Sequence, residues 1–124
     1  SALAALSEEQ LLSCRLGYRW AYIQKTARDI DSGKFSLDAL KTMDDEALQQ
    51  NLMTLYGVGT KVASCVALFG FHRLNAFPVD VWMKRVMKNH YPHGYPIREY
   101  TPYNGIYQQY LFAYARRHEG EQRP

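Results

Sequence analysis

The sequence is poor in cysteine, and this scarcity excludes several kinds of site. Cys14 and Cys65 are the only two cysteines, too few for a disulfide framework or for a four-cysteine zinc or iron-sulfur site. Of the four histidines, His90 and His93 lie close together, but no carboxylate or Cys completes a set of transition-metal ligands. We therefore expect no bound transition metal, no organic cofactor, and a reducing compartment.

Long apolar runs and a secretory leader are also absent. No run approaches the roughly 18 apolar residues of a membrane span, and no basic start precedes an apolar stretch as in a signal peptide. We expect a protein that makes no membrane contact and is not secreted: cytoplasmic (at the nucleoid) if bacterial, nuclear if eukaryotic. The chain starts at Ser1 within an apolar stretch, so we also expect it to lack an upstream N-terminal domain.

Neither sign of charge dominates. The sequence holds 15 Lys and Arg against 12 Asp and Glu, a formal net charge of +3, which permits a polyanionic partner without requiring one. Its 124 residues, 47% of them hydrophobic, suffice for one globular domain with a core. Strand-like alternation is almost missing, whereas apolar spacings of three and four recur, as in helices. We predict a monomeric all-α domain over residues 1–124, with about seven helices and no sheet.

Capping residues, Gly and Pro mark the ends of the expected helices. The first helix runs from a capping box of Ser7 and Gln10 to near Gly17, the second covers residues 19–31 and is ended by Gly33, and the third covers residues 36–40 and is capped by Ser36. The fourth helix is capped by Asp44, the fifth covers residues 60–71, the sixth begins at Asp80, and the seventh covers residues 103–118. The residues expected to face inward are Leu48, Leu52 and Leu55, then Val62, Val66 and Phe69, then Met83, Val86 and Met87. A loop is expected at 92–102 and a tail at 120–124.

The turn Gly57-Val58-Gly59-Thr60 joins two helices that must fold back on each other. Its glycines permit positive φ and close approach of a partner, and the free amides that open the next helix attract an anion such as phosphate. The alternative is a tight turn in which the glycines serve geometry alone.

Lys61 falls in the first turn of the helix that follows. The positive end of the helix dipole disfavours a cation there, and partial desolvation would add to this, favouring the neutral amine that attacks carbon and forms a Schiff base. A Lys that only binds phosphate is the alternative. Asp80 lies 19 residues later at a helix start; it is an N-cap by position, and a carboxylate beside an amine also suits departure of a leaving group from a sugar carbon.

The hairpin Leu-x-Gly-Val-Gly-x-Lys-x-Ala of residues 55–63, followed by Pro-Val-Asp at 78–80, resembles the helix-hairpin-helix, Gly/Pro-rich, Asp superfamily of DNA glycosylases. The match is to its 8-oxoguanine branch, which Leu16-Gly17-Tyr18-Arg19 and the spacing of Gly105, Gln108 and Phe112 also resemble. The resemblance implies a helix-hairpin-helix near 44–71, a catalytic Asp region at 76–90 and a final helix at 103–118. Its implied partner is damaged double-stranded DNA, and its implied activity is base excision with strand cleavage.

Carried onto matching positions, the resemblance implies roles for individual residues. Lys61 would attack C1′ and Asp80 would stabilise the transition state. The implied base pocket comprises Cys65, Pro78, Met83, Gln108 and Phe112, and the implied contacts with the DNA backbone are Gly57, Val58, Gly59 and Thr60. Hairpin carbonyls near Met53, Leu55 and Val58 would hold a monovalent cation. Cys65 and Phe112 can equally be ordinary core residues, and the family's common His two positions after the Asp is Trp82 here.

Two other functions stay open at this point. The chain can belong to a helix-hairpin-helix glycosylase for another damaged base, or to a non-catalytic DNA-binding module in which Lys61 only contacts phosphate. The parts of the family that distinguish 8-oxoguanine from guanine and read the opposite cytosine cannot be located in this sequence.

Overall fold

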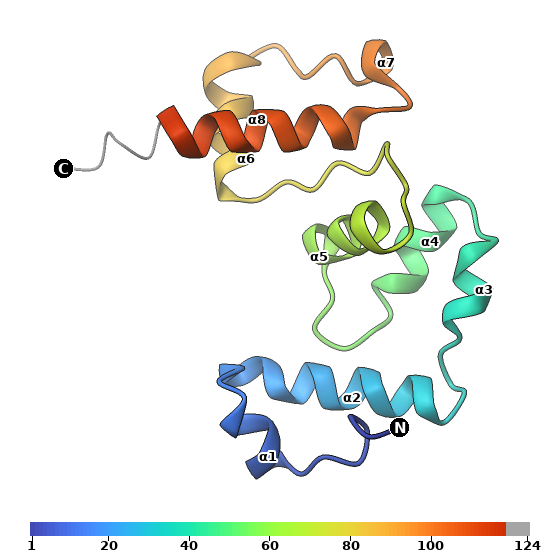
Figure 1. Cartoon of the computed structure of the whole chain (residues 1–124). Coiled ribbons are helices and arrows are strands. Elements are labelled where there is room, and N and C mark those ends of the chain that lie inside the picture. Colours follow the sequence, from blue (N-terminus) through green and yellow to red (C-terminus); the bar gives the residue numbers. More distant parts are fainter. Residues whose placement is uncertain (119–124) are drawn as a thin grey trace. The chain divides into compact units, whose positions relative to one another are not determined.

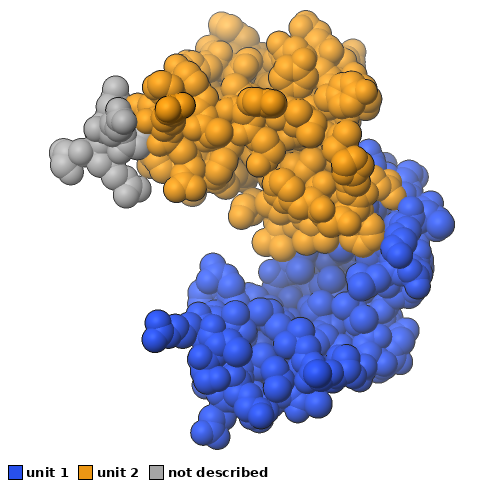
Figure 2. Space-filling model, viewed as in Figure 1, with its two compact units in different colours: residues 1–59 blue, residues 60–124 orange. Residues whose placement is uncertain are grey.

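The computed structural model describes residues 1–118, and in them the chain is helical without a strand (Figure 1). This confirms the all-α prediction. The chain divides into two compact units, residues 1–59 and residues 60–124 (Figure 2). That residues 1–124 form a single domain stays a prediction. No helix within residues 1–118 is long and apolar enough to cross a membrane. The predicted tail at 120–124 lies outside the described residues.

The first unit begins with helices whose starts follow the predicted caps. It contains α1 (Glu8–Ser13), a 3₁₀ turn η1 (Gly17–Arg19), α2 (Trp20–Asp31), α3 (Leu37–Lys41) and α4 (Asp45–Leu52). The capping box of Ser7 and Gln10 is present, and the side chains of Ser36 and Asp44 accept hydrogen bonds from the backbone three residues on. The first helix ends earlier than predicted because Arg15 already has a positive φ of 58°, which a right-handed helix cannot contain.

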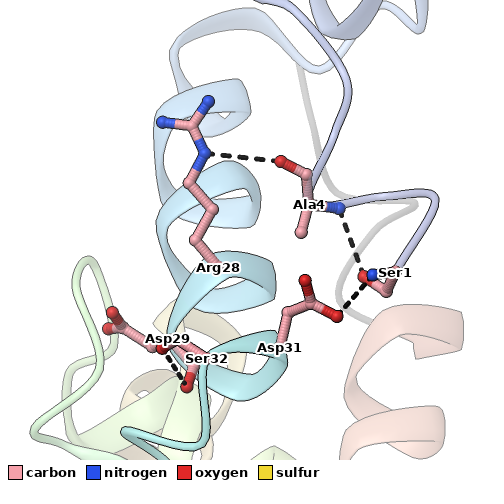
Figure 3. Close-up of polar contacts among 6 residues, drawn as sticks. All are labelled: Ser1, Ala4, Arg28, Asp29, Asp31 and Ser32. Carbon is pink, nitrogen blue, oxygen red and sulfur yellow. Dashed lines mark hydrogen bonds and ion pairs between the residues drawn. The ribbon is translucent and has the colours of Figure 1, made fainter.

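The core of the first unit is a set of leucines. Leu11, Leu40, Leu48 and Leu52 are each at most 2% exposed, while Leu55, expected beside them, is half-buried. Near the N-terminus, the segment before α1 lies against α2 (Figure 3): Arg28 Nε donates to the Ala4 carbonyl at 3.4 Å, and the terminal ammonium of Ser1 pairs with Asp31.

Gly57, in the turn after α4, lies close to the Tyr22 side chain of α2. Its φ is +80°, and a Cβ there would lie 2.6 Å from ring carbons of Tyr22, so both backbone conformation and space require glycine. The hairpin glycine therefore has a structural reason independent of any ligand.

The second unit contains one more helix than the sequence indicates. It holds α5 (Thr60–Cys65), a π-helical turn η2 (Val66–Gly70), α6 (Val81–His90), α7 (Ile97–Tyr100) and α8 (Asn104–His118). Helix α7 lies in the expected loop at 92–102, so residues 1–118 form eight α-helices. Its four residues, bounded by Pro96 and Pro102, are too few to show a helical period.

The prediction for the inward face of α5 is wrong at two positions. Val62 is 41% and Phe69 is 65% exposed, whereas Ala63 and Ala67 are buried. The side of this helix that carries the alanines is the buried one, and the larger Val62 and Phe69 side chains lie on the exposed side.

Helices α6 and α8 pack against each other around a small core. Met83 and Val86 of α6 and Ala115 of α8 are at most 1% exposed, and Met87 packs against them. The predicted inward face of α6 is therefore confirmed. At the start of α8, Gly105 donates its N–H to the Leu74 carbonyl at 2.7 Å, and a Cβ there would lie 2.6 Å from Leu68 Cδ1. This close approach fixes the first turn of α8.

Candidate active site

A pocket of about 210 Å³ lies within the second unit, where α5, the segment before α6, and α8 meet. Six of the seven residues predicted as catalytic or base-contacting line it. The full lining consists of Lys61, Cys65, Phe69, Pro78, Asp80, Gln108, Gln109 and Phe112. Three segments that are distant in sequence thus bring the predicted amine and carboxylate into one concave site.

Lys61, Cys65 and Phe69 line the pocket along one stripe. They follow one another at intervals of four residues, which places them on one side of α5 and its π-helical extension. Phe69 was assigned to the core on its apolar character, although its spacing from Lys61 and Cys65 was sufficient to place it in the site. Lys61 is exposed, so the structure gives no support to the partial desolvation expected of it.

Asp80 caps α6 and lines the pocket. Its Oδ1 accepts a hydrogen bond from the Met83 N–H at 2.9 Å, and its backbone is extended, as predicted for an N-cap. The other carboxylate oxygen has no hydrogen-bond partner among residues 1–118. One oxygen therefore holds the helix start, and the second is available to a ligand.

Gln108 joins α8 to the segment that leads into Asp80. Its side chain is 3% exposed, and Nε2 donates to the Pro78 carbonyl at 2.9 Å. Its Oε1 accepts a hydrogen bond from Gln109 Nε2. Gln109 was not predicted as a site residue, and only its position next to Gln108 pointed to it. These bonds fix the wall of the pocket opposite α5.

Met83 is the predicted pocket residue that lies elsewhere. Its side chain is 0% exposed and sits in the core with Val86 and Ala115. As the third residue after the cap, it gives its backbone N–H to Asp80 and turns its side chain toward α8. Met83 was expected in the pocket wall, but its side chain packs in the core between α6 and α8.

The predicted hairpin contacts stay predictions. Gly57, Val58 and Gly59 end the first unit and Thr60 begins the second; nothing in the structure tests their binding to phosphate or the proposed cation at the hairpin carbonyls. Residues 1–118 contain no group of three or more His, Cys, Asp or Glu side chains placed to hold a metal ion.

Comparison with known proteins places this architecture in a class. No protein-family model matches the chain. The structure of an 8-oxoguanine glycosylase/lyase from Clostridium acetobutylicum, in complex with duplex DNA containing cytosine opposite 8-oxoG, superposes with a TM-score of 0.86 at 32% identity over 94% of this chain. The fold is that of the helix-hairpin-helix DNA glycosylases.

Sequence relatives narrow the class to a family. A “Probable N-glycosylase/DNA lyase” of Methanothermobacter thermautotrophicus is 38% identical over 120 residues, and the match covers 90% of this chain and 38% of that protein. The N-glycosylase/DNA lyase of Saccharomyces cerevisiae is 35% identical over 95 residues, covering 68% of this chain and 25% of the yeast protein. The chain belongs to the 8-oxoguanine DNA glycosylase (N-glycosylase/DNA lyase) family. It spans 38% of the Methanothermobacter relative and 43% of the Clostridium structure.

Proposed function

We propose that this chain carries the catalytic residues of an enzyme that excises 8-oxoguanine from duplex DNA and then cleaves the strand. The observation that carries the proposal is the pocket in which Lys61 and Asp80 are both wall residues. The Clostridium relative supports the substrate, since its structure contains DNA with cytosine opposite 8-oxoG.

The chemistry uses an amine and a carboxylate on a sugar carbon. The neutral amine of Lys61 attacks C1′ of the damaged nucleotide, and the base departs with the electrons of its glycosidic bond. As positive charge develops on the sugar ring, the free oxygen of Asp80 offsets it. The nitrogen then loses a proton and expels O4′ from C1′, which opens the sugar ring and leaves an imine between Lys61 and C1′. The imine makes the C2′ proton acidic, and loss of that proton expels the 3′ phosphate, which nicks the strand.

The remaining pocket residues hold the extruded base. Cys65 on α5 and Phe112 on α8 offer apolar surfaces to its two faces. Gln108 uses one N–H for Pro78 and one lone pair for Gln109, so a second N–H and a second lone pair remain for the Watson-Crick edge of the base. Amides of residues 57–60 bind the flanking phosphate.

Borohydride trapping tests the proposal, because reduction turns only an imine into a permanent crosslink. The full-length gene product is mixed with duplex DNA containing 8-oxoguanine and reduced. We expect a crosslink with the wild type and with the control Lys34→Gln, an exposed lysine of the first unit, and none with Lys61→Gln. Wild-type trapping by Lys61→Gln would exclude Lys61 as the nucleophile; failure of the wild type to trap would exclude the lyase activity.

A further inference from the structure

The net charge of +3 conceals a strong difference between the two units. Residues 1–59 hold six Lys and Arg and eight Asp and Glu, whereas residues 60–124 hold nine and four. Between Asp80 and Glu99 the sequence contains four Lys and Arg, two His and no acidic residue. The positive charge is therefore concentrated in the unit that contains the pocket.

Helix α6 displays part of this charge on one exposed face. Lys84, Arg85 and Lys88 are all exposed and, at about 100° per residue, lie within an arc of about 100° on the side opposite the core residues Met83 and Val86. No ion pair joins any of the three to a carboxylate within residues 1–118. We call these three residues the basic face of α6.

Trp82 lies beside the basic face of α6, and its ring contacts Arg85. The ring is half-buried against the core of α6 and α8, and the Arg85 guanidinium carbon lies 5.0 Å from the ring centroid. A guanidinium at this distance is attracted by the aromatic ring. The ring thus restricts the Arg85 side chain to this end of the basic face.

The position of the face relative to the pocket is set by the helix itself. Asp80, which lines the pocket, caps the first turn of α6, and the 10 residues of the helix extend about 15 Å from it. Lys84 therefore lies about one turn from the carboxylate, and Lys88 about two turns. Because duplex DNA carries one negative charge per about 1.7 Å of its axis, phosphates that flank a nucleotide at the pocket can fall within the length of this helix.

We propose that the basic face of α6 is a contact surface for the phosphate backbone of duplex DNA, distinct from the hairpin. Charge complementarity carries the proposal: three cations unpaired within residues 1–118 on one helix, with an 18-residue stretch free of acids around them. The choice of DNA over another polyanion rests on the proposed function. The contact is independent of base sequence and of damage, and it anchors the strand beside the pocket.

The test is the salt dependence of binding by the 124-residue chain to an undamaged DNA duplex. Each phosphate contact contributes about 0.9 to the slope of log K against log salt concentration. Lys84→Gln with Lys88→Gln should therefore reduce the slope by about two. The matched control is Arg98→Gln with Arg117→Gln, which removes two exposed charges of the same unit from α7 and α8. We expect its slope to stay at the wild-type value.

Four results would overturn the inference: an unchanged slope in the α6 variant, an equal loss in the control, no binding of the wild type to the duplex at low salt, or tighter α6-dependent binding to vesicles of anionic phospholipid than to DNA. Far-ultraviolet circular dichroism confirms that both variants are helical. Because the duplex is undamaged, a slope that depends on α6 supports the contact even when borohydride trapping fails, so the two proposals fail separately.

Discussion

Replacing Asp80 separates two tasks of one side chain. Its Oδ1 holds the Met83 N–H at 2.9 Å in a partly buried position, and loss of such a cap costs about 1 kcal/mol, with a range of about 0.5–2. Asp80→Ala should lower the melting temperature by about 4–8 °C per kcal/mol in a small domain. Asp80→Asn should lower it little, because Asn caps a helix as well as Asp does.

Both variants remove the charge that offsets the developing cation, so both should lose excision alike. Removing preorganised charge stabilisation typically slows catalysis by about 10² or more, or about 2.7 kcal/mol in the barrier. Melting is followed on the 124-residue chain, and single-turnover excision of 8-oxoguanine on the full-length gene product. Wild-type excision by Asp80→Asn, with only Asp80→Ala impaired, would reduce Asp80 to a structural cap and refute its catalytic role.

Three further predictions follow from the second unit. Gly105→Ala should destabilise the chain by about 1–3 kcal/mol, because a Cβ there would lie 2.7 Å from the fixed Leu74 carbonyl. The control Gly70→Ala should not destabilise it, since the nearest atom to a Cβ at Gly70 is 3.7 Å away. Equal denaturation midpoints for the two variants would contradict this prediction. Burial, with repulsion from neighbouring phenols, raises the pKa of Tyr95 to about 12, so stability should fall as the pH rises from about 10 to 12, where the unfolded phenol ionises first. Tyr95→Phe should abolish that part of the loss and, since the buried hydroxyl has no hydrogen-bond partner in residues 1–118, should not destabilise the fold near neutral pH; pH-dependent denaturation checks both. Finally, the 124-residue chain should excise 8-oxoguanine far more slowly than the Clostridium acetobutylicum glycosylase/lyase, of which it spans 43%, because base extrusion costs a few kcal/mol that further contacts must offset. Rates within about tenfold, or 1.4 kcal/mol, would contradict this.

Local signals in the sequence predicted the helix starts well. Ser7, Ser36, Asp44 and Asp80 all cap helices, because a cap depends on a side chain and on amides two or three residues away. The extent of the first helix was less predictable, since nothing in the sequence marks Arg15 for a positive φ.

Burial was harder to predict because it depends on partners distant in sequence. Phe69 has the character of a core residue but is exposed in the pocket wall, while Met83, expected in that wall, is fully buried. Apolar periodicity defines a face of a helix but does not say whether large or small side chains on it will meet another helix. Gly105 shows the same limit: its need for glycine comes from Leu74 and Leu68, more than 30 residues away.

The two cysteines, scarce as they are, make the pocket directly observable. Cys65 is half-buried in the pocket wall, and Cys14 is exposed in the other unit. A small thiol-alkylating reagent therefore labels one thiol at the site and one reference thiol on the same polypeptide, and mass spectrometry distinguishes the two peptides. Protection of Cys65 alone, with Cys14 labelled at its usual rate, would report occupancy of the pocket by a base, without mutation or an attached fluorophore.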